Sequence, residues 1–221
     1  MQRLPVPPRR ATAPSVIARY DREVTSYDPT TALIVVDVQN DFADSAGSLS
    51  VRGAPEILPI VNAEIERAAA AGTLVVYTQD WHPPSTPHFA KDGGIWPVHC
   101  VQETWGAAFH PDLIVGDSVV RKGANGEDGY SGFSMRDPTT GETIPTRLDS
   151  VLRNAGVKSV VIVGLATDYC VKATALDAQA LGYPATVLGA GVRAVDLQGG
   201  DGERAIRDMQ DAGVTVEDAG A

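Results

Sequence analysis

The segment from Val160 to Cys170, with the sequence VVIVGLATDYC, constrains the fold of this chain more than any other. Its first four residues are apolar and β-branched, which is typical of a central parallel strand that is covered on both faces. The pattern breaks at Gly164, and apolar residues then recur at helical spacing from Val171 to Leu181. The segment therefore predicts a buried strand, a sharp turn and a helix that carries a cysteine in its first turn.

Cys170 is a candidate nucleophile because of its place in this turn. Thr167 or Asp168 is the expected N-cap of the helix, so that Cys170 lies among the free N–H groups of the first turn. The positive end of the helix dipole there favours a thiolate and predicts a lowered thiol pKa. A buried structural cysteine is the alternative that this feature leaves open, because free cysteines are among the most buried residues.

Strands alternate with helices along most of the chain, which predicts an α/β fold. The expected strands are 32–36, 74–78, 118–121, 160–163, 185–188 and 214–216, and the other expected helices are 55–71, 145–155 and 203–212. Each of the four helices runs into a glycine suited to a left-handed C-cap, at positions 72, 156, 182 and 213. We expect a single domain over residues 30–221: a mostly parallel six-stranded sheet with helices on both faces, as in a Rossmann-like three-layer sandwich.

The composition of the chain limits the classes of binding partner and the cellular compartment that we expect for the protein. A formal net charge of -10 and a pI near 4.7 argue against nucleic acid or an anionic membrane surface, and are compatible with a small-molecule substrate. Two cysteines are too few for a disulfide framework and no apolar run could span a membrane, so a cytoplasmic protein, which could be a homo-oligomer, is expected. Residues 1–29 are expected to form a flexible or partner-draping arm. Its first twenty residues contain arginine but no acid, as in a transit peptide, yet their prolines oppose an amphipathic helix.

Four ionisable residues stand at or just beyond the ends of predicted strands: Asp37, Asp80, Lys122 and Cys170. Because the carboxyl ends of parallel strands meet at one sheet edge, we expect them to lie together. Asp37 could take the thiol proton and later deliver it to a leaving amine, while Lys122 could hold both anions. An ordinary ion pair between Asp37 and Lys122 is the alternative.

A second cluster lies in the loop after the predicted strand 74–78. It contains Asp80, His82, His88 and His99, and thus three of the four histidines of the chain. Neutral imidazoles with a carboxylate suit zinc, iron or manganese, and the Asp-x-His spacing lets two neighbours reach one ion. Alternatively, the histidines cluster by accident or cap local backbone. His110 has no evident partner and is expected to be structural.

These residues together resemble one family, the nicotinamidases or pyrazinamidases of the isochorismatase-like cysteine hydrolases, from about Thr31 to the C-terminus. The resemblance rests on four motifs: Val36-Asp37-Val38-Gln39-Asn40-Asp41-Phe42; Asp80, His82, His88 and His99 with Trp96-Pro97; Lys122-Gly123 followed by Tyr130-Ser131-Gly132-Phe133; and Gly164-Leu165-Ala166-Thr167-Asp168-Tyr169-Cys170. The triad positions mark the whole superfamily, whereas the metal set marks the nicotinamidase branch. The resemblance leaves the arm without a counterpart.

The resemblance implies a role for each matching residue. Cys170 would attack a carboxamide carbon, Asp37 would pass the proton to departing ammonia, and Lys122 would support both, by way of a thioester. The backbone N–H groups of Ala166 and Cys170 would form the oxyanion hole, with a cis peptide bond between Leu165 and Ala166. The expected activity is the hydrolysis of nicotinamide to nicotinate and ammonia in NAD salvage.

The resemblance also implies one divalent metal ion, zinc before iron or manganese, which would hold the pyridine nitrogen of the substrate. Phe42, Trp96 and Tyr130 would wall the substrate ring, although each could instead be an ordinary core or rim aromatic residue. Two other functions stay open at this point: hydrolysis of a different small amide by the same triad, and a non-catalytic binding protein whose metal only pins the long loop.

Overall fold

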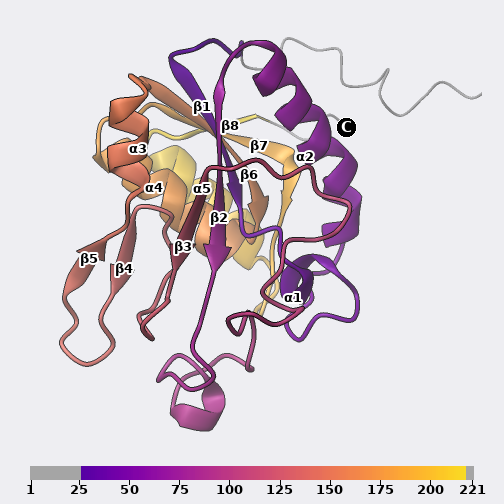
Figure 1. Cartoon of the computed structure of the whole chain (residues 1–221), viewed down its shortest axis with the longest axis vertical. Coiled ribbons are helices and arrows are strands. Elements are labelled where there is room, and N and C mark those ends of the chain that lie inside the picture. Colours follow the sequence, from indigo (N-terminus) through magenta and orange to yellow (C-terminus); the bar gives the residue numbers. More distant parts are fainter. Residues whose placement is uncertain (1–25, 218–221) are drawn as a thin grey trace, which may run out of the picture.

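The computed structural model of the protein describes residues 26–217, and their centre is one six-stranded sheet (Figure 1). Its strands are β1 (Thr31–Val36), β2 (Leu74–Asp80), β3 (Val119–Lys122), β6 (Ser159–Leu165), β7 (Ala185–Arg193) and β8 (Thr215–Glu217). The strand order is β3-β2-β1-β6-β7-β8 and every neighbouring pair is parallel. The chain therefore builds outward twice, first from β1 and then from β6, and ligands of such sheets bind where the order reverses.

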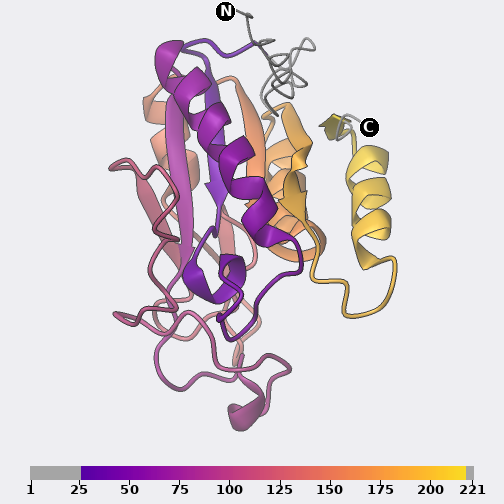
Figure 2. The same cartoon turned by 90° about the vertical axis from the view of Figure 1, so that its right-hand side faces the viewer.

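Helices cover both faces of the sheet, as expected. They are α2 (Ala54–Ala70) on one face, and α3 (Leu148–Asn154), α4 (Lys172–Ala180) and α5 (Asp201–Asp211) on the other (Figures 1 and 2). All six residues of β1 are buried, and successive side chains point to opposite faces. Ile34 packs in the core beneath α3, α4 and α5, while Leu33 and Val35 pack in the core beneath α2. The predicted three-layer α/β architecture is confirmed.

The expected helix ends are also confirmed at four glycines. Gly72, Gly156, Gly182 and Gly213 follow α2, α3, α4 and α5, with φ between 71° and 89°. This left-handed conformation is cheap only for a residue without a Cβ atom, so that each glycine ends its helix and turns the chain toward the next strand.

The segment between β3 and β6 differs from the prediction. The helix expected over 145–155 begins only at Leu148, because Thr143–Pro145 forms strand β5 of a small antiparallel hairpin with β4 (Ser134–Arg136). Three-residue strands are too short to show an alternating pattern, and proline is tolerated because this pair has only edges. A short helix, α1 (Asn40–Ala43), and a 3₁₀ turn at Ala90–Asp92 were likewise not predicted.

The predicted arm, residues 1–29, falls almost wholly outside the described residues, and the boundary between arm and domain stays a prediction. Within the described residues, none of the helices combines the length and the apolar character that crossing a membrane requires.

Candidate active site

Cys170 lies in the tight turn between β6 and α4. The Leu165–Ala166 peptide bond is cis, as the resemblance implied, and residues Thr167–Val171 then form one π-helical turn that leads into α4. The carbonyl oxygen of Ala166 accepts hydrogen bonds from Val171 N at 3.0 Å and Tyr169 N at 3.1 Å. Cys170 is therefore held in the first turn after the strand, where it was expected.

The predicted N-cap of this turn was wrong. Ala166 occupies the N-cap position, and no side chain caps the helix there. The carboxylate of Asp168 instead accepts hydrogen bonds from the backbone N–H groups of Val195 and Asp196, both at 2.9 Å. Asp168 thus fastens the turn that holds Cys170 to the segment after β7, which could not be read from local sequence.

Asp37, Lys122 and Cys170 meet at the carboxyl ends of their strands, in the interior of the protein. Lys122 Nζ lies 2.7 Å from Asp37 Oδ2 and 3.6 Å from Cys170 Sγ. The hydroxyl of Thr78 donates to Asp37 Oδ1 at 2.7 Å, and Asp37 and Lys122 are both fully buried. The ammonium group therefore contacts both the carboxylate and the thiol, as expected from the strand-end positions.

Burial sets the protonation of these groups. It raises the pKa of Asp37 to about 6, although the charge of Lys122 opposes the change. It also raises the pKa of the Cys170 thiol well above its usual value; Lys122 opposes this, and Asp37 adds to it. The predicted lowering of the thiol pKa was therefore wrong, because burial of the thiol outweighs the charge of Lys122, which favours the thiolate. Near neutral pH the resting pair is a thiol beside a carboxylate, in which Asp37 can accept the proton.

Asp80, the last residue of β2, joins this triad to the histidine cluster. One of its carboxylate oxygens, Oδ1, is hydrogen-bonded to Lys122 Nζ, and the other, Oδ2, lies 3.6 Å from His82 Nε2 and 3.9 Å from His99 Nε2. Although burial raises it, the charge of Lys122 and the neighbouring histidines bring the pKa of Asp80 below its ordinary value. Asp80 is therefore a carboxylate that contacts both Lys122 of the triad and the histidine cluster.

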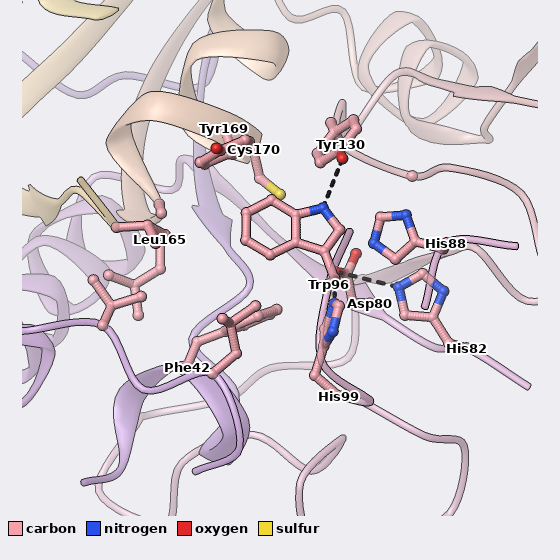
Figure 3. Close-up of a pocket in the computed structure, with 15 residues that line it drawn as sticks. Phe42, Asp80, His82, His88, Trp96, His99, Tyr130, Leu165, Tyr169 and Cys170 are labelled. Carbon is pink, nitrogen blue, oxygen red and sulfur yellow. Dashed lines mark hydrogen bonds and ion pairs between the residues drawn. The ribbon is translucent and has the colours of Figure 1, made fainter. Parts of the chain in front are cut away.

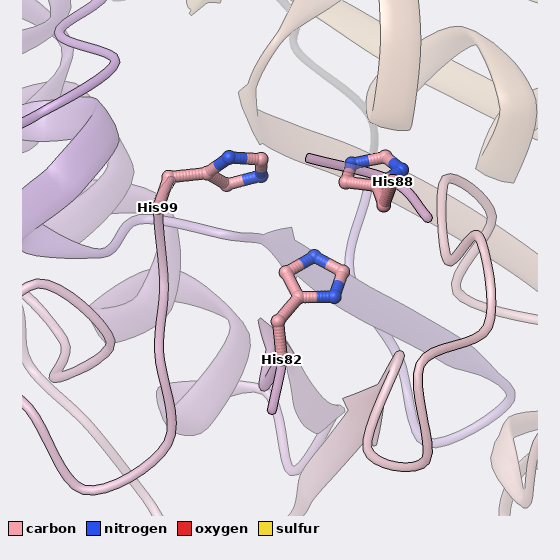
Figure 4. A group of neighbouring side chains, drawn as sticks. All are labelled: His82, His88 and His99. Atoms are coloured by element: carbon pink, nitrogen blue, oxygen red, sulfur yellow. The ribbon is translucent and has the colours of Figure 1, made fainter. Parts of the chain in front are cut away.

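The three histidines converge as a metal site requires (Figure 4). His82, His88 and His99 each offer a ring nitrogen, and these atoms lie within 4.8 Å of one another. Both ring nitrogens of His82 are buried without a hydrogen-bond partner among residues 26–217, which is costly unless a ligand satisfies them. Burial lowers the pKa of His99 to about 4 and also lowers the pKa of His88, so both are neutral and ready to ligate. The residues present fit a divalent metal ion.

Aromatic side chains surround a pocket between Cys170 and the histidines (Figure 3). Phe42, Trp96 and Tyr130 line it, and Trp96 Nε1 donates a hydrogen bond to the Tyr130 hydroxyl at 2.8 Å. Tyr169 was not predicted, but its ring packs edge-on against Trp96 with centroids 4.8 Å apart. Ala166 and Cys170 also line the pocket.

Two residues of the first motif position the site, and sequence reasoning gave them no role. Gln39 exchanges two hydrogen bonds of 2.8 Å with the backbone of Asp80, which fixes the end of β2. The carboxylate of Asp41 accepts from the backbone N–H of Cys100 at 2.7 Å and thereby anchors the residue after His99. The position of both residues within the first motif, between Asp37 and Phe42, was the one sequence feature that could have indicated this role.

His110 lies apart from the site. It is buried, its Nδ1 accepts a hydrogen bond from Asp112 N at 3.2 Å, and its Nε2 lies 3.8 Å from Asp44. Its neighbours are thus loop residues outside the pocket, in keeping with the structural place expected for it.

Known proteins are similar to this chain in sequence and in fold. A profile of the isochorismatase domain matches residues 31–221. The nicotinamidase of Escherichia coli (strain K12) is 37% identical over 206 residues, which cover 85% of this chain and 94% of that protein. The crystal structure of the pyrazinamidase of Pyrococcus horikoshii in complex with zinc is 40% identical, with a TM-score of 0.76, and the match covers 86% of this chain and 99% of that chain. That of PnC1 from L. infantum in complex with nicotinate is 32% identical, with a TM-score of 0.78 and coverage of 88% and 96%.

The parallel sheet and the matched profile define the class: the chain belongs to the isochorismatase family. Within that family, it is similar to nicotinamidases and pyrazinamidases along most of its length and most of theirs. The resemblance drawn from the motifs is confirmed.

Proposed function

We propose that this protein is a metal-dependent cysteine amidase that hydrolyses nicotinamide, and pyrazinamide, to the corresponding acid and ammonia. The observation that carries the proposal is that Cys170 and three histidines line one aromatic pocket, while the buried ammonium group of Lys122 contacts both the Cys170 thiol and Asp37. Similarity to nicotinamidases and pyrazinamidases supports the same substrates. A place in NAD salvage and in the cytoplasm, where Cys170 stays reduced, belongs to the proposal.

The protein side chains supply the nucleophile and the proton path. Asp37 accepts the thiol proton as Cys170 Sγ attacks the amide carbon, and Lys122, 3.6 Å from Sγ, stabilises the developing thiolate. The oxyanion would be held by the backbone N–H groups of Ala166 and Cys170, two residues that line the pocket. The C–N bond then breaks as Asp37 returns the proton to the amine. Ammonia departs, and the acyl group remains on Cys170 as a thioester. Water, deprotonated by Asp37, hydrolyses the thioester and restores the thiol.

The histidine cluster supplies orientation in this proposal. His82, His88 and His99 would hold one divalent ion together with Asp80, whose Oδ2 lies beside His82 and His99, and zinc is the proposed metal. When bound, the ion would offer an open position to the ring nitrogen of the substrate. Phe42 and Trp96 wall the ring, and this fixes the distance between the ring and Cys170.

The decisive experiment compares nicotinamide with benzamide, which has the same shape and carboxamide but no ring nitrogen. We expect benzamide to be poorer in kcat/KM by several orders of magnitude, because a site built to ligate a nitrogen discriminates by about 10⁴-fold or more against an analogue without it. Chelation should lower nicotinamide turnover while circular dichroism shows an unchanged fold. Ammonia release is the assay.

A panel of other small amides, including ureido compounds, separates this proposal from hydrolysis of a different substrate. Faster turnover of a ureido compound than of nicotinamide would assign the triad to another amide. Equal turnover of benzamide and nicotinamide, or activity that survives metal removal, would show that the ion does not orient the substrate.

A further inference from the structure

The three histidines of the proposed metal site differ in what their rings contact on the side away from the site. His99 Nδ1 is 2.8 Å from the carbonyl oxygen of Pro97, which can only accept, so that Nδ1 carries the proton and Nε2 is a free lone pair. The ring of His82 abuts Gly123, where an added Cβ would lie 2.6 Å from its Cε1. One ring is thus fixed by a carbonyl and one by close packing against backbone.

Within residues 26–217, His88 is the only one of the three whose ring contacts a charged group on the side away from the site. Its Nδ1 is 2.8 Å from Oδ1 of Asp128, forty residues further along the chain. The His88 side chain is buried and that of Asp128 is partly exposed. Neither the sequence motifs nor the proposed mechanism uses Asp128.

The backbone holds Asp128 in place for this contact. Asp128 and Arg136, which belongs to β4, exchange two backbone hydrogen bonds, both at 2.8 Å. The next residue, Gly129, accepts a hydrogen bond from Lys122 Nζ through its carbonyl oxygen. Asp128 is therefore part of an ordered segment that already contacts the triad, and its carboxylate is not a freely moving surface group.

A carboxylate in this position determines how the imidazole can act. An ionised carboxylate accepts a hydrogen bond from Nδ1–H, which fixes the tautomer and leaves Nε2 as the ligand atom. The negative charge also increases the basicity of that nitrogen, and loss of such a partner typically weakens metal binding by about 10- to 100-fold. Without Asp128, His88 could rotate or take the other tautomer, because no other partner of its ring nitrogens is found among residues 26–217.

We propose that Asp128 is the positioning residue that makes His88 a metal ligand, and so couples the segment after β3 to the metal site. The proposal rests on the metal site of the proposed function. It extends that site from its ligands to the group that orients one of them.

The test measures zinc affinity directly, by competition with a chromogenic chelator, for the wild type, Asp128→Asn and Asp128→Ala. We expect the alanine variant to bind zinc about 10- to 100-fold more weakly. The asparagine variant should lose less, since its amide oxygen can still accept from Nδ1–H although it has no charge. The visible spectrum of the cobalt-substituted protein should change in Asp128→Ala, because the ligand field reports the orientation of His88.

The matched control is Glu127→Gln, which changes the neighbouring carboxylate of the same segment. Glu127 accepts hydrogen bonds from Asn125 and makes none to His88, so this variant should keep wild-type zinc affinity and cobalt spectrum. If Glu127→Gln lost as much affinity as Asp128→Ala, the effect would come from the loop as a whole and the proposal would be overturned.

Two further outcomes are separable. Zinc affinity within twofold of wild type and an unchanged cobalt spectrum in Asp128→Ala would overturn the role of Asp128 and leave the metal site intact. A wild-type protein that does not bind zinc or cobalt would instead overturn the metal site of the proposed function. Should Asp128→Ala fail to fold, the comparison of Asp128→Asn with Glu127→Gln decides the matter.

Discussion

Replacement of Lys122 by methionine should destabilise the protein strongly, beyond its effect on activity. The ammonium group is fully buried between Asp37 Oδ2, at 2.7 Å, and the carboxylate of Asp80. Methionine has a similar volume but no charge, so two buried carboxylates lose their counter-ion. Breaking a buried ion pair in this way costs about 3–5 kcal/mol of unfolding free energy, a large part of the stability of most domains.

The pH dependence of this loss identifies its cause. Burial already raises the pKa of Asp37 to about 6 against the opposing charge of Lys122, and removal of that charge should raise this pKa further. A carboxyl group that binds its proton more tightly in the folded state makes folding more favourable at low pH. The cost of Lys122→Met should therefore be greatest above the raised Asp37 pKa of the variant, and should shrink as the pH falls from that pKa toward the wild-type value of about 6.

Denaturant unfolding of the variant and the wild type at about pH 7.5 and about pH 5 measures both effects. Lys158→Met is the matched control, because Lys158 is exposed and should change the unfolding free energy by no more than about 0.5 kcal/mol. A loss below about 1 kcal/mol for Lys122→Met, or a loss that is the same at both pH values, would refute the reasoning about buried charge.

Other predictions follow from the triad. Cys170→Ala should lower kcat/KM by about 10⁴-fold or more and leave the fold intact. The double variant Cys170→Ala/Asp37→Ala should be scarcely worse, because the two groups act as a unit. Additive losses of kcat/KM would contradict this. Iodoacetamide should label Cys170, which lines the pocket, before the fully buried Cys100, as peptide mass mapping would show; equal rates would speak against it. Because the base must be ionised, kcat/KM should fall about tenfold per pH unit below the Asp37 pKa of about 6, whereas a flat profile would assign the base elsewhere.

The fold was predictable because its strands are buried on both faces and its helices end at glycine. The apolar run of β1 and the glycine after each of four helices can be recognised from a few adjacent residues of the sequence. The placement of Asp37, Lys122 and Cys170 at one edge followed from the rule that parallel strands end together. The β4–β5 hairpin gave no such signal, because each of its strands has only three residues.

The protonation and support of the site could not be predicted in the same way. The pKa of Cys170 depends on how deeply it is buried and on Asp37 and Asp80, which are remote in sequence, so the helix end alone gave the wrong direction. Asp168 and Asp128 act through contacts with residues 27 and 40 positions away, and nothing in their local sequence distinguishes them from solvent-exposed acids.

The shared carboxylate of Asp80 has a consequence for how this protein can change over generations. One substitution there removes a ligand of the proposed metal and a counter-ion of Lys122, the lysine of the proposed triad, at once. In a lineage that loses the metal, the first substitution should more readily replace one of the histidines, because its loss leaves Lys122 paired with both carboxylates. Substitution of Asp80 should therefore be tolerated least. Among related proteins that have lost the metal, we expect substitutions at His88 and His99 to be more frequent than substitutions at Asp80.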